Sequence, residues 1–558
     1  MQNNLKYSNI IGMSTEQSMY MYLKEGCNDL SAKKLIYFNN EYNCEEMFHE
    51  IDRVAGYLTS IGVTAGDVVS VALPNMPEAI FALYGANAIN AVTNFIHPQI
   101  TVVGLKKLMK STRSKVIFIY DKLYDQIKEI QSFSNINCIV CSVSTRMKSI
   151  YKYIVRFTEP KLHNVFRYDD MPENLDYTLS EVDPNSPAAY IHSGGTTGRP
   201  KTVVLSNRAL NSLSEDIINT LYPDPNNSYK PTDCMLMCLP IFHGFGLGVC
   251  VHTLLPRAHL VLLPMFKASM AIKAMKKFKI SHMAGVPAMY RMILDNKKFR
   301  GDFSSLSHVF CGADKLPIDL KARFDEKLQN LGSSAEVLEG YGLTETTTVF
   351  SLNRPGMTKP RSQGQPLIGN RVAVFDFDGN QLNVGESGEL YLEAKAVMTE
   401  YLNDRESTKM AIINIDGTQW LKTGDYGYID EDNHIYFKDR IKRSIKIAAV
   451  NVFPAEVEEL VSEMDEIEEC CVARAEVNGK PHTILYVVLK NGCELNSRLE
   501  KKIKTNIALN LMHYAVPKQI IKKDNLYHTA IGKVDYVKYE KELKCIQEQQ
   551  KNNKQAPC

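Results

Sequence analysis

The sequence lacks the features of a secreted, membrane-spanning or nucleic-acid-binding protein. Its 558 residues carry a net charge of only +2, so no strong field points to a nucleic acid as partner. No basic segment followed by an apolar one opens the chain, so we expect no secretory signal. The most apolar stretch, at about residues 245–265, is interrupted by His252, Pro256, Arg257 and His259. A buried strand–turn–strand therefore fits it better than a membrane span.

Cysteine gives no sign of a disulfide framework. The 13 cysteines are odd in number and scattered over a long chain, which fits a reducing compartment. Cys138 and Cys141 form a C-x-x-C pair, but apolar residues separate them and no second ligand pair stands at a suitable spacing for zinc. We therefore expect a buried strand at this pair and a cytoplasmic location for the chain.

The length requires several domains, because single hydrophobic cores stop growing near about 250–300 residues. With 44% hydrophobic and 23% charged residues, the composition is that of a globular enzyme. Up to about residue 430, apolar strand-like runs such as 68–73 and 116–120 alternate with helical patterns such as 78–91. This alternation favours an α/β fold with mostly parallel sheets.

A strand-rich region and then a smaller α+β region follow. Strand-like runs occupy residues 372–377 and 388–393, on either side of a turn signal. The pattern then changes to a helix near 455–464 and two strands at 471–475 and 483–489. We predict a small separate C-terminal domain that ends in a frayed polar tail.

One short segment has two interpretations. Apolar residues recur at helical spacing beside a basic stripe: Met147, Ile150, Tyr151, Ile154 and Val155, with Lys148, Lys152 and Arg156. A helix in weak peripheral contact with an anionic membrane is one interpretation. A surface helix packed on its own domain is the one that the short apolar face favours.

The strongest chemical signal is a loop rich in glycine and threonine, between strand-like runs at 188–191 and 203–205. It comprises Ser193, Gly194, Gly195, Thr196, Thr197, Gly198, Arg199, Pro200 and Lys201. Glycine lets backbone N–H groups approach an anion, while hydroxyls and a lysine add donors and positive charge, as a polyphosphate requires. The spacing is not that of the Walker motif.

A second cluster lies at residues 339–346. Tyr341 stands between two glycines and could lay its ring against a flat base. Thr344 can bond a phosphate or carboxylate oxygen, and Glu345 is a hard-oxygen ligand suited to Mg²⁺. A tight turn with a surface tyrosine and glutamate is the alternative. Further along, Asp425 follows a turn glycine and suits the hydroxyls of a ribose.

Together with residues 312–314 and Lys533, these motifs resemble the adenylate-forming superfamily, whose members include acyl-CoA synthetases, aryl-CoA ligases, peptide-synthetase adenylation domains and beetle luciferases. Five motifs appear in family order over about residues 42–536. The resemblance implies an AMP-binding domain at 1–438, with two doubly wound sheets and a small β-barrel-like subdomain. It also implies a mobile α+β lid domain at 439–558.

The resemblance implies a role for each motif residue. ATP phosphates would be held by Ser193, Gly194, Gly195, Thr196, Thr197, Gly198 and Lys201. Adenine and the acyl carboxylate would lie beside Gly312, Ala313, Asp314, Glu339, Gly340, Tyr341 and Gly342. Asp425 and Arg440 would bind the ribose, and Ser193 and Glu345 would bind Mg²⁺. The catalytic groups would be Lys533, Thr344 and Glu345, with Lys442 at the hinge and Lys446 facing the site in the second step.

The implied reaction has two steps. A carboxylate attacks the α-phosphorus of ATP and expels pyrophosphate, with Mg²⁺ and a positioned ammonium stabilising the growing charge. A thiolate, that of coenzyme A, then attacks the acyl-AMP. The lid is expected to rotate between the two steps.

The acid is expected to be a plain carboxylic acid. Phe242 and His243 stand near the place where amino-acid-activating members have an aspartate for the substrate amine. Gly285 lies in a second segment beside the pocket, and His243 is either a pocket wall or a structural histidine. We favour a medium- or long-chain fatty acid because no polar specificity group stands out, and an aryl acid stays open.

Two residues depart from the family pattern. Gly194 replaces a common serine, and Ala449 stands where members that use coenzyme A usually have glycine. A methyl group at Ala449 could narrow the pantetheine channel, so the phosphopantetheine of a carrier protein is the alternative acceptor. The joint presence of Lys533, Glu345 and Asp425 speaks against a non-catalytic relative. A luciferase-like oxygenase is a remote alternative.

Overall fold

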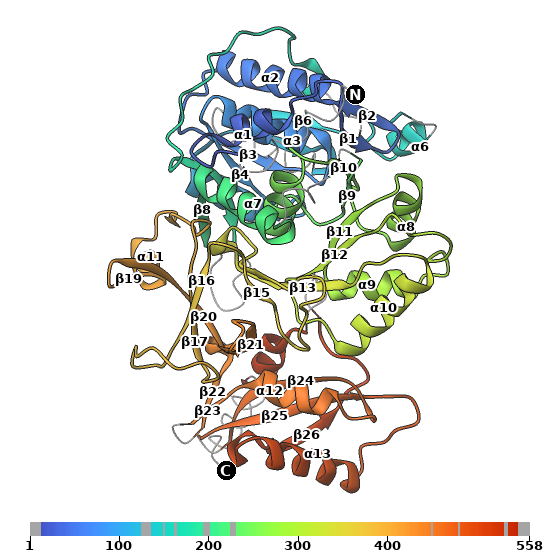
Figure 1. Ribbon diagram of the computed structural model, residues 1–558, viewed down its shortest axis with the longest axis vertical. Coiled ribbons are helices and arrows are strands. Elements are labelled where there is room, and N and C mark those ends of the chain that lie inside the picture. Colours follow the sequence, from blue (N-terminus) through green and yellow to red (C-terminus); the bar gives the residue numbers. More distant parts are fainter. Residues whose placement is uncertain are drawn as a thin grey trace, which may run out of the picture. The chain divides into compact units, whose positions relative to one another are not determined.

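The protein is seen in a computed structural model that describes residues 13–123, 136–148, 151–160, 165–193, 201–223, 230, 232–447, 450–477, 480–528 and 534–544. Within these ranges the chain builds two large sheets with helices around them, a smaller sheet and a C-terminal group of strands and helices (Figure 1). It divides into two compact units. The first holds described residues up to 372 and those at 392–421, and the second holds 373–391 and those from 422 onward.

The first large sheet carries the ends of the predicted phosphate loop. Its seven strands follow the order β18 (Glu400–Tyr401), β8 (Thr202–Ser206), β7 (Pro187–His192), β4 (Val92–Phe95), β3 (Val68–Ala72), β5 (Ser114–Tyr120) and β6 (Asn137–Cys141). The strands from β7 to β6 are parallel, whereas β8 pairs antiparallel with both β7 and β18. Every residue of β3 is buried, as expected for a parallel sheet covered on both faces. Cys138 and Cys141 lie in β6, so the predicted strand is confirmed.

The second large sheet carries the predicted adenine and acyl segments. Its nine strands follow the order β15 (Gln365–Pro366), β14 (Ser351–Leu352), β13 (Val337–Tyr341), β12 (His308–Cys311), β11 (His282–Gly285), β9 (Cys234–Met237), β10 (His259–Leu262), β1 (Lys33–Tyr37) and β2 (Asn40–Asn43). The strands from β13 to β1 are parallel. Their carboxyl ends therefore share one edge, which is where ligands bind in open α/β sheets.

The remaining strands form smaller groups. A five-stranded sheet comprises β16 (Arg371–Phe375), β17 (Gly388–Glu393), β19 (Ile412–Ile415), β20 (Thr418–Ile429) and β21 (Ile435–Arg440), in which β20 pairs antiparallel with β19 and β21. The C-terminal part contains β22 (Ile445–Ile447), β23 (Val450–Val452), β24 (Ile467–Val477), β25 (Lys480–Leu489) and β26 (Gln519–Lys522), with helices α12 (Pro454–Ser462) and α13 (Ser497–Asn510). The predicted α/β fold with an α+β C-terminal part is confirmed.

The interpretation of residues 245–265 as strand–turn–strand is wrong in its first half. Phe245–Thr253 forms a π-helix, η3, in which all residues after the first are buried, and β10 follows it. A short apolar run buried on all sides has no polar face, so its sequence shows neither a helical nor a strand period.

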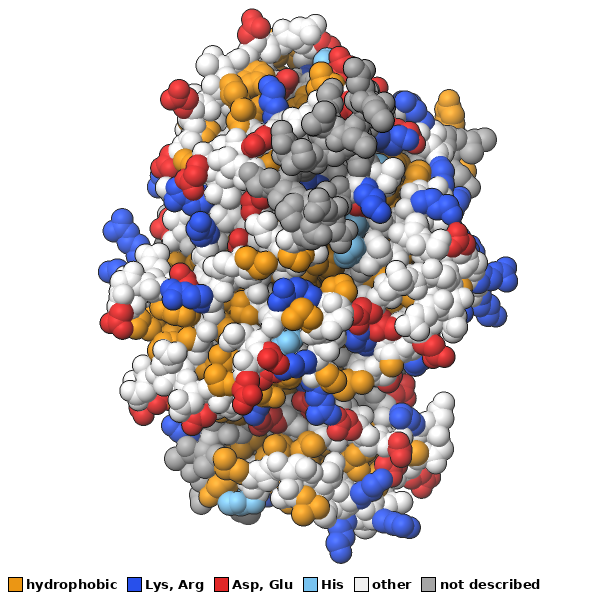
Figure 2. All heavy atoms as spheres, viewed as in Figure 1, with side chains coloured by type: hydrophobic (Ala, Val, Ile, Leu, Met, Phe, Trp, Pro, Cys, Tyr) orange, Lys and Arg blue, Asp and Glu red, His pale blue; other side chains and the backbone are white. Residues whose placement is uncertain are grey.

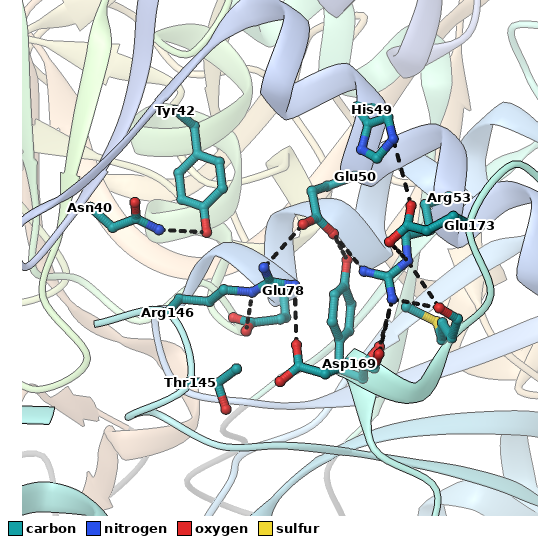
Figure 3. Close-up of polar contacts among 12 residues, drawn as sticks. Asn40, Tyr42, His49, Glu50, Arg53, Glu78, Thr145, Arg146, Asp169 and Glu173 are labelled. Carbon is teal, nitrogen blue, oxygen red and sulfur yellow. Dashed lines mark hydrogen bonds and ion pairs between the residues drawn. The ribbon is translucent and has the colours of Figure 1, made fainter. Parts of the chain in front are cut away.

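A buried charge cluster fixes the loop that follows β6 (Figure 3). The Arg146 guanidinium lies 3.1 Å from a Glu50 carboxylate oxygen, 3.4 Å from one of Glu78 and 3.4 Å from one of Asp169. Glu50 belongs to α2 (Cys44–Ser60), and Glu78 belongs to α3 (Pro77–Ala88) and is fully buried. Burial raises the pKa of Glu78 to about 7, although Arg146 opposes the shift.

We predict that Arg146→Met destabilises the chain in a pH-dependent manner. The variant leaves the Glu78 carboxylate buried without its cation, so the free energy of unfolding falls by roughly 3–5 kcal/mol at pH 8. Burial raises the pKa of Glu78 from its unfolded value of 4.5 to about 7. The folded chain therefore binds a proton at Glu78 more tightly than the unfolded chain does, and its free energy of unfolding rises as the pH falls from about 7. The deficit should therefore be smaller at pH 5.5 than at pH 8 in urea unfolding.

The double variant Glu78→Gln/Arg146→Met is the matched control, because it removes the buried charge together with its partner. It should lose less stability than Arg146→Met at pH 8. A deficit of Arg146→Met that is the same at both pH values would contradict the assignment to Glu78.

Candidate functional site

The two ends of the predicted phosphate loop are held together where β7 ends. The backbone N–H of Ser193 donates to the carbonyl oxygen of Lys201 at 2.9 Å, and the N–H of Lys201 donates to Ser193 Oγ at 3.3 Å. Between them, Gly194, Gly195, Thr196, Thr197 and Gly198 lie outside the described residues, so their roles stay predictions. The β7–β8 hairpin fixes where the loop begins and ends.

Tyr401 joins the end of this loop to Glu345. It lies in β18, where it pairs with Val203 of β8. Lys201 Nζ lies over its ring, 4.3 Å from the centroid, and its hydroxyl donates to Glu345 Oε1 at 2.7 Å. The Glu345 carbonyl also accepts the N–H of Met398 at 2.7 Å. Lys201, which the sequence predicts to hold phosphate, and Glu345, which it predicts to bind Mg²⁺, thus both contact Tyr401. The sequence gives no signal for the role of Tyr401.

The chain around Glu345 is strained. Glu345 lies in the short 3₁₀ helix η4 (Thr344–Thr346), and Thr347 and Thr348 follow it with φ angles of 59° and 139°. Residues with a β-branched side chain rarely adopt such angles. The surrounding structure enforces them in part through the Thr347 hydroxyl, which donates to the carbonyl oxygen of Ala396 at 2.6 Å.

Gly340, Tyr341 and Gly342 lie where β13 ends and the chain turns. Gly340 and Tyr341 are paired with β14, and Tyr341 is half-buried. A Cβ added at Gly342 would lie 1.6 Å from the carbonyl oxygen of Thr348. Because that oxygen belongs to the backbone, only glycine fits this turn.

Gly312, at the end of β12, lies close to the same turn. A Cβ there would be 3.6 Å from the carbonyl oxygen of Gly340 and 3.2 Å from the ring of Phe245. Ala313 has a φ of 66°, and Asp314 is exposed, its Oδ1 accepting the N–H of the next residue. The structure therefore brings the two predicted adenine segments together at the first turn of η3.

Glu339 faces inward from β13. Its Oε1 accepts bonds from the N–H of Leu316 and from Gln363 Nε2, both at 3.4 Å. Burial raises its pKa to about 7. Through these hydrogen bonds Glu339 connects β13 to the segments that contain Leu316 and Gln363. Its contact with a nucleotide stays a prediction.

Phe242 and His243 form an aromatic group with His97. The ring centroid of Phe242 lies 4.6 Å from that of His97 and 4.8 Å from that of His243. Burial lowers the pKa of both histidines, and for His243 the proximity of His97 adds to the effect, so both rings are neutral at pH 7. Sequence reasoning misses His97, because a lone histidine in a loop has no pattern.

Gly285 ends β11 so close to Tyr290 that a Cβ would lie 3.1 Å from its hydroxyl.

The predicted ribose pair lies in the second unit. Asp425 in β20 and Arg440 at the end of β21 are register partners, and Arg440 Nη1 lies 2.9 Å from Asp425 Oδ1. The Asp425 side chain is fully buried, whereas that of Arg440 is half-exposed. Lys442 and Lys446 follow as exposed residues. Lys533 and Ala449 lie outside the described residues.

Comparisons with known proteins decide the family. Residues 27–402 match the family described as AMP-binding enzyme, and residues 456–533 match its C-terminal domain. The chain belongs to the AMP-binding enzyme family. The prediction of an adenylate-forming enzyme of the acyl-CoA synthetase type is confirmed.

Curated relatives and solved structures are similar over most of their length. A long-chain-fatty-acid–CoA ligase of Bacillus subtilis (strain 168) is 28% identical, over 88% of this chain and 89% of the relative. A 4-coumarate–CoA ligase 3 of Arabidopsis thaliana is 29% identical, over 83% and 79%. ATP-bound MatB from Rhodopseudomonas palustris superposes with a TM-score of 0.81 at 21% identity, over 96% of this chain and 100% of that chain, which shows the shared fold.

We predict that Gly342→Ala disrupts the turn after β13. The new methyl group would meet the backbone oxygen of Thr348, so the free energy of unfolding should fall by about 2–3 kcal/mol in urea unfolding. Gly312→Ala is the matched control, because the one tight contact of its methyl group is with the movable edge of the Phe245 ring, so it should cost less than about 1 kcal/mol. Equal stability of the two variants would show that the turn is not restricted to glycine.

Proposed function

We propose that the chain joins a carboxylic acid to AMP at the expense of ATP and then transfers the acyl group to the thiol of coenzyme A. The arrangement of Lys201, Tyr401 and Glu345 carries this proposal. It holds an ammonium and a carboxylate beside a loop whose composition suits a polyphosphate. Relatives that are named CoA ligases support the choice of acceptor.

In the first step, an oxygen of the substrate carboxylate attacks the α-phosphorus of ATP, and the bond to pyrophosphate breaks. Lys201 and the loop before it would hold the outer phosphates, and Thr344 would contact the α-phosphate. Lys533 would stabilise the charge that grows as two anions approach. Asp425 and Arg440 would hold the ribose hydroxyls.

Glu345 fits the role of a ligand to Mg²⁺. Within the described ranges its carboxylate accepts a bond from Tyr401, and an ionised carboxylate offers about four acceptor positions, which suits a hard cation. Bound Mg²⁺ would neutralise phosphate charge. Tyr401 would act as a positioning residue that fixes the direction of the carboxylate.

In the second step, a thiolate attacks the acyl carbonyl of the mixed anhydride, and AMP leaves. Coenzyme A is the proposed acceptor. The phosphopantetheine of a carrier protein remains the alternative, because Ala449 stands where a glycine is usual in members that use coenzyme A.

We further propose a medium- or long-chain fatty acid as the substrate. The described pocket segment presents Phe242 and a neutral His243, which suits an apolar chain better than a charged one. The B. subtilis relative is named for this substrate. An aryl acid is the second candidate, supported by the aromatic group with His97 and by the relatives named for 4-coumarate.

An acid panel tests the function directly. We expect pyrophosphate and acyl-AMP, seen by mass spectrometry, when the chain is given ATP, Mg²⁺ and a fatty acid, and acyl-CoA when coenzyme A is added. Parallel arms with cinnamic and benzoic acids and with a carrier protein separate the alternatives. Lys533→Ala is the control for contaminating activity and should release almost no pyrophosphate. Nucleotide binding without pyrophosphate from any acid would refute an enzyme of this kind.

We predict that Tyr401→Phe raises the Mg²⁺ concentration needed for half-maximal adenylation. Loss of a hydrogen bond to a carboxylate should weaken the site by about tenfold, with little change in rate at saturating Mg²⁺. Tyr168→Phe is a matched control, because its hydroxyl donates to Glu50 in the buried charge cluster at 3.0 Å. If both variants depend on Mg²⁺ as the parent does, Glu345 does not hold the ion.

A further inference from the structure

Helix α6 (Tyr151–Phe157) presents large apolar side chains to solvent. Tyr153 is 65% exposed, Ile154 58% and Phe157 91%. Phe157 stands four positions after Tyr153 and three after Ile154, so its side chain lies beside both of them on the helix surface. They are three of the 16 exposed large hydrophobic side chains in the described part of the chain, yet they fall within five positions. Single exposed apolar residues are ordinary, but such a group needs an explanation.

Basic residues accompany this face. Lys148 and Arg156 are exposed, and Lys152 is half-buried. No residue of α6 is acidic. The next carboxylate, that of Glu159, accepts the N–H and the hydroxyl of Ser144 at 2.9 and 2.6 Å. Figure 2 shows an apolar protrusion with basic side chains beside it at the edge where Figure 1 places α6.

The described residues on both sides of α6 are fixed to the first unit. Before the helix, Met147 is buried and Arg146 belongs to the buried charge cluster (Figure 3). After it, Glu159 is bonded to Ser144, which is itself buried. Met147, which we expected on the apolar face of the helix, lies before α6 and is buried, whereas Ile154 on α6 is exposed.

We propose that α6 is an interfacial anchor that docks the chain on a bilayer with anionic headgroups. Tyr153, Ile154 and Phe157 would enter the boundary between headgroups and acyl chains, and the lysines and arginine would face the headgroups. Among the described residues, no helix has the length and apolarity to cross a bilayer. A contact made by three apolar side chains of a seven-residue helix would be shallow and reversible.

Charge decides between the possible occupants of this face. A second copy of the chain or a protein partner would also cover apolar side chains. An excess of lysine and arginine with no acidic residue on the helix complements an anionic surface instead. The anchor does not depend on the proposed reaction, because none of its residues belongs to the candidate site.

Flotation with lipid vesicles tests the anchor on the full chain. We expect binding to vesicles of phosphatidylcholine mixed with phosphatidylglycerol, and weaker binding to phosphatidylcholine alone. Phe157→Asp should lower the partition coefficient at least about tenfold. Val103→Asp is the matched control, because Val103 is 77% exposed on α4 (Val102–Thr112) and should not matter. Lys152→Glu/Arg156→Glu should reduce binding only to the anionic vesicles, by about fivefold per charge removed.

Equal partition of Phe157→Asp and the parent chain would overturn the anchor, as would a parent chain that does not float with anionic vesicles at low salt. A dimer in solution that Phe157→Asp dissociates, without any lipid preference, would assign the face to a second copy and also overturn it. Pyrophosphate release with a water-soluble acid, measured on every variant, reports on the proposed function separately.

Discussion

The hydroxyl of Tyr401 makes the contact on which the geometry of the candidate site depends. A two-residue strand, β18, brings Tyr401 beside β8, nearly two hundred residues earlier in the chain. There its hydroxyl holds Glu345 and its ring lies under the Lys201 ammonium. A bond to an ionised carboxylate is among the stronger hydrogen bonds, and a cation over an aromatic face adds to it. One side chain thus contacts both the lysine that we propose to hold phosphate and the carboxylate that we propose to hold Mg²⁺.

The sequence predicts the features of this fold that have local causes. The runs that became β3 and β5 are continuously apolar, as buried parallel strands are, and the loop between β7 and β8 follows from its glycines. The helix η3 escapes prediction because a fully buried segment has no polar face to set its period. Tyr401 and His97 escape it for another reason. Their roles come from pairings between distant segments, and no short pattern records such a pairing.

Buried acids in this chain show why a raised pKa is a poor guide to the site. Burial raises the pKa of both Glu78 and Glu339 to about 7. Glu78 is balanced by Arg146 in a cluster that fixes a loop, and Glu339 braces strand ends through Leu316 and Gln363. Both shifts therefore have structural causes. The case for Glu345, the carboxylate that we propose to hold Mg²⁺, rests instead on its hydrogen bond from Tyr401, whose ring also contacts Lys201.

The nature of the acid and the role of α6 bear on each other. A long-chain fatty acid partitions into bilayers, so an enzyme held at the surface meets it at a much higher local concentration than in water. A small aryl acid is water-soluble, and docking would bring its enzyme no such advantage. An aromatic side chain as exposed as Phe157 favours self-association unless something covers it. Its exposure beside basic residues therefore makes most physical sense in an enzyme whose substrate lies in the same bilayer that would cover the helix.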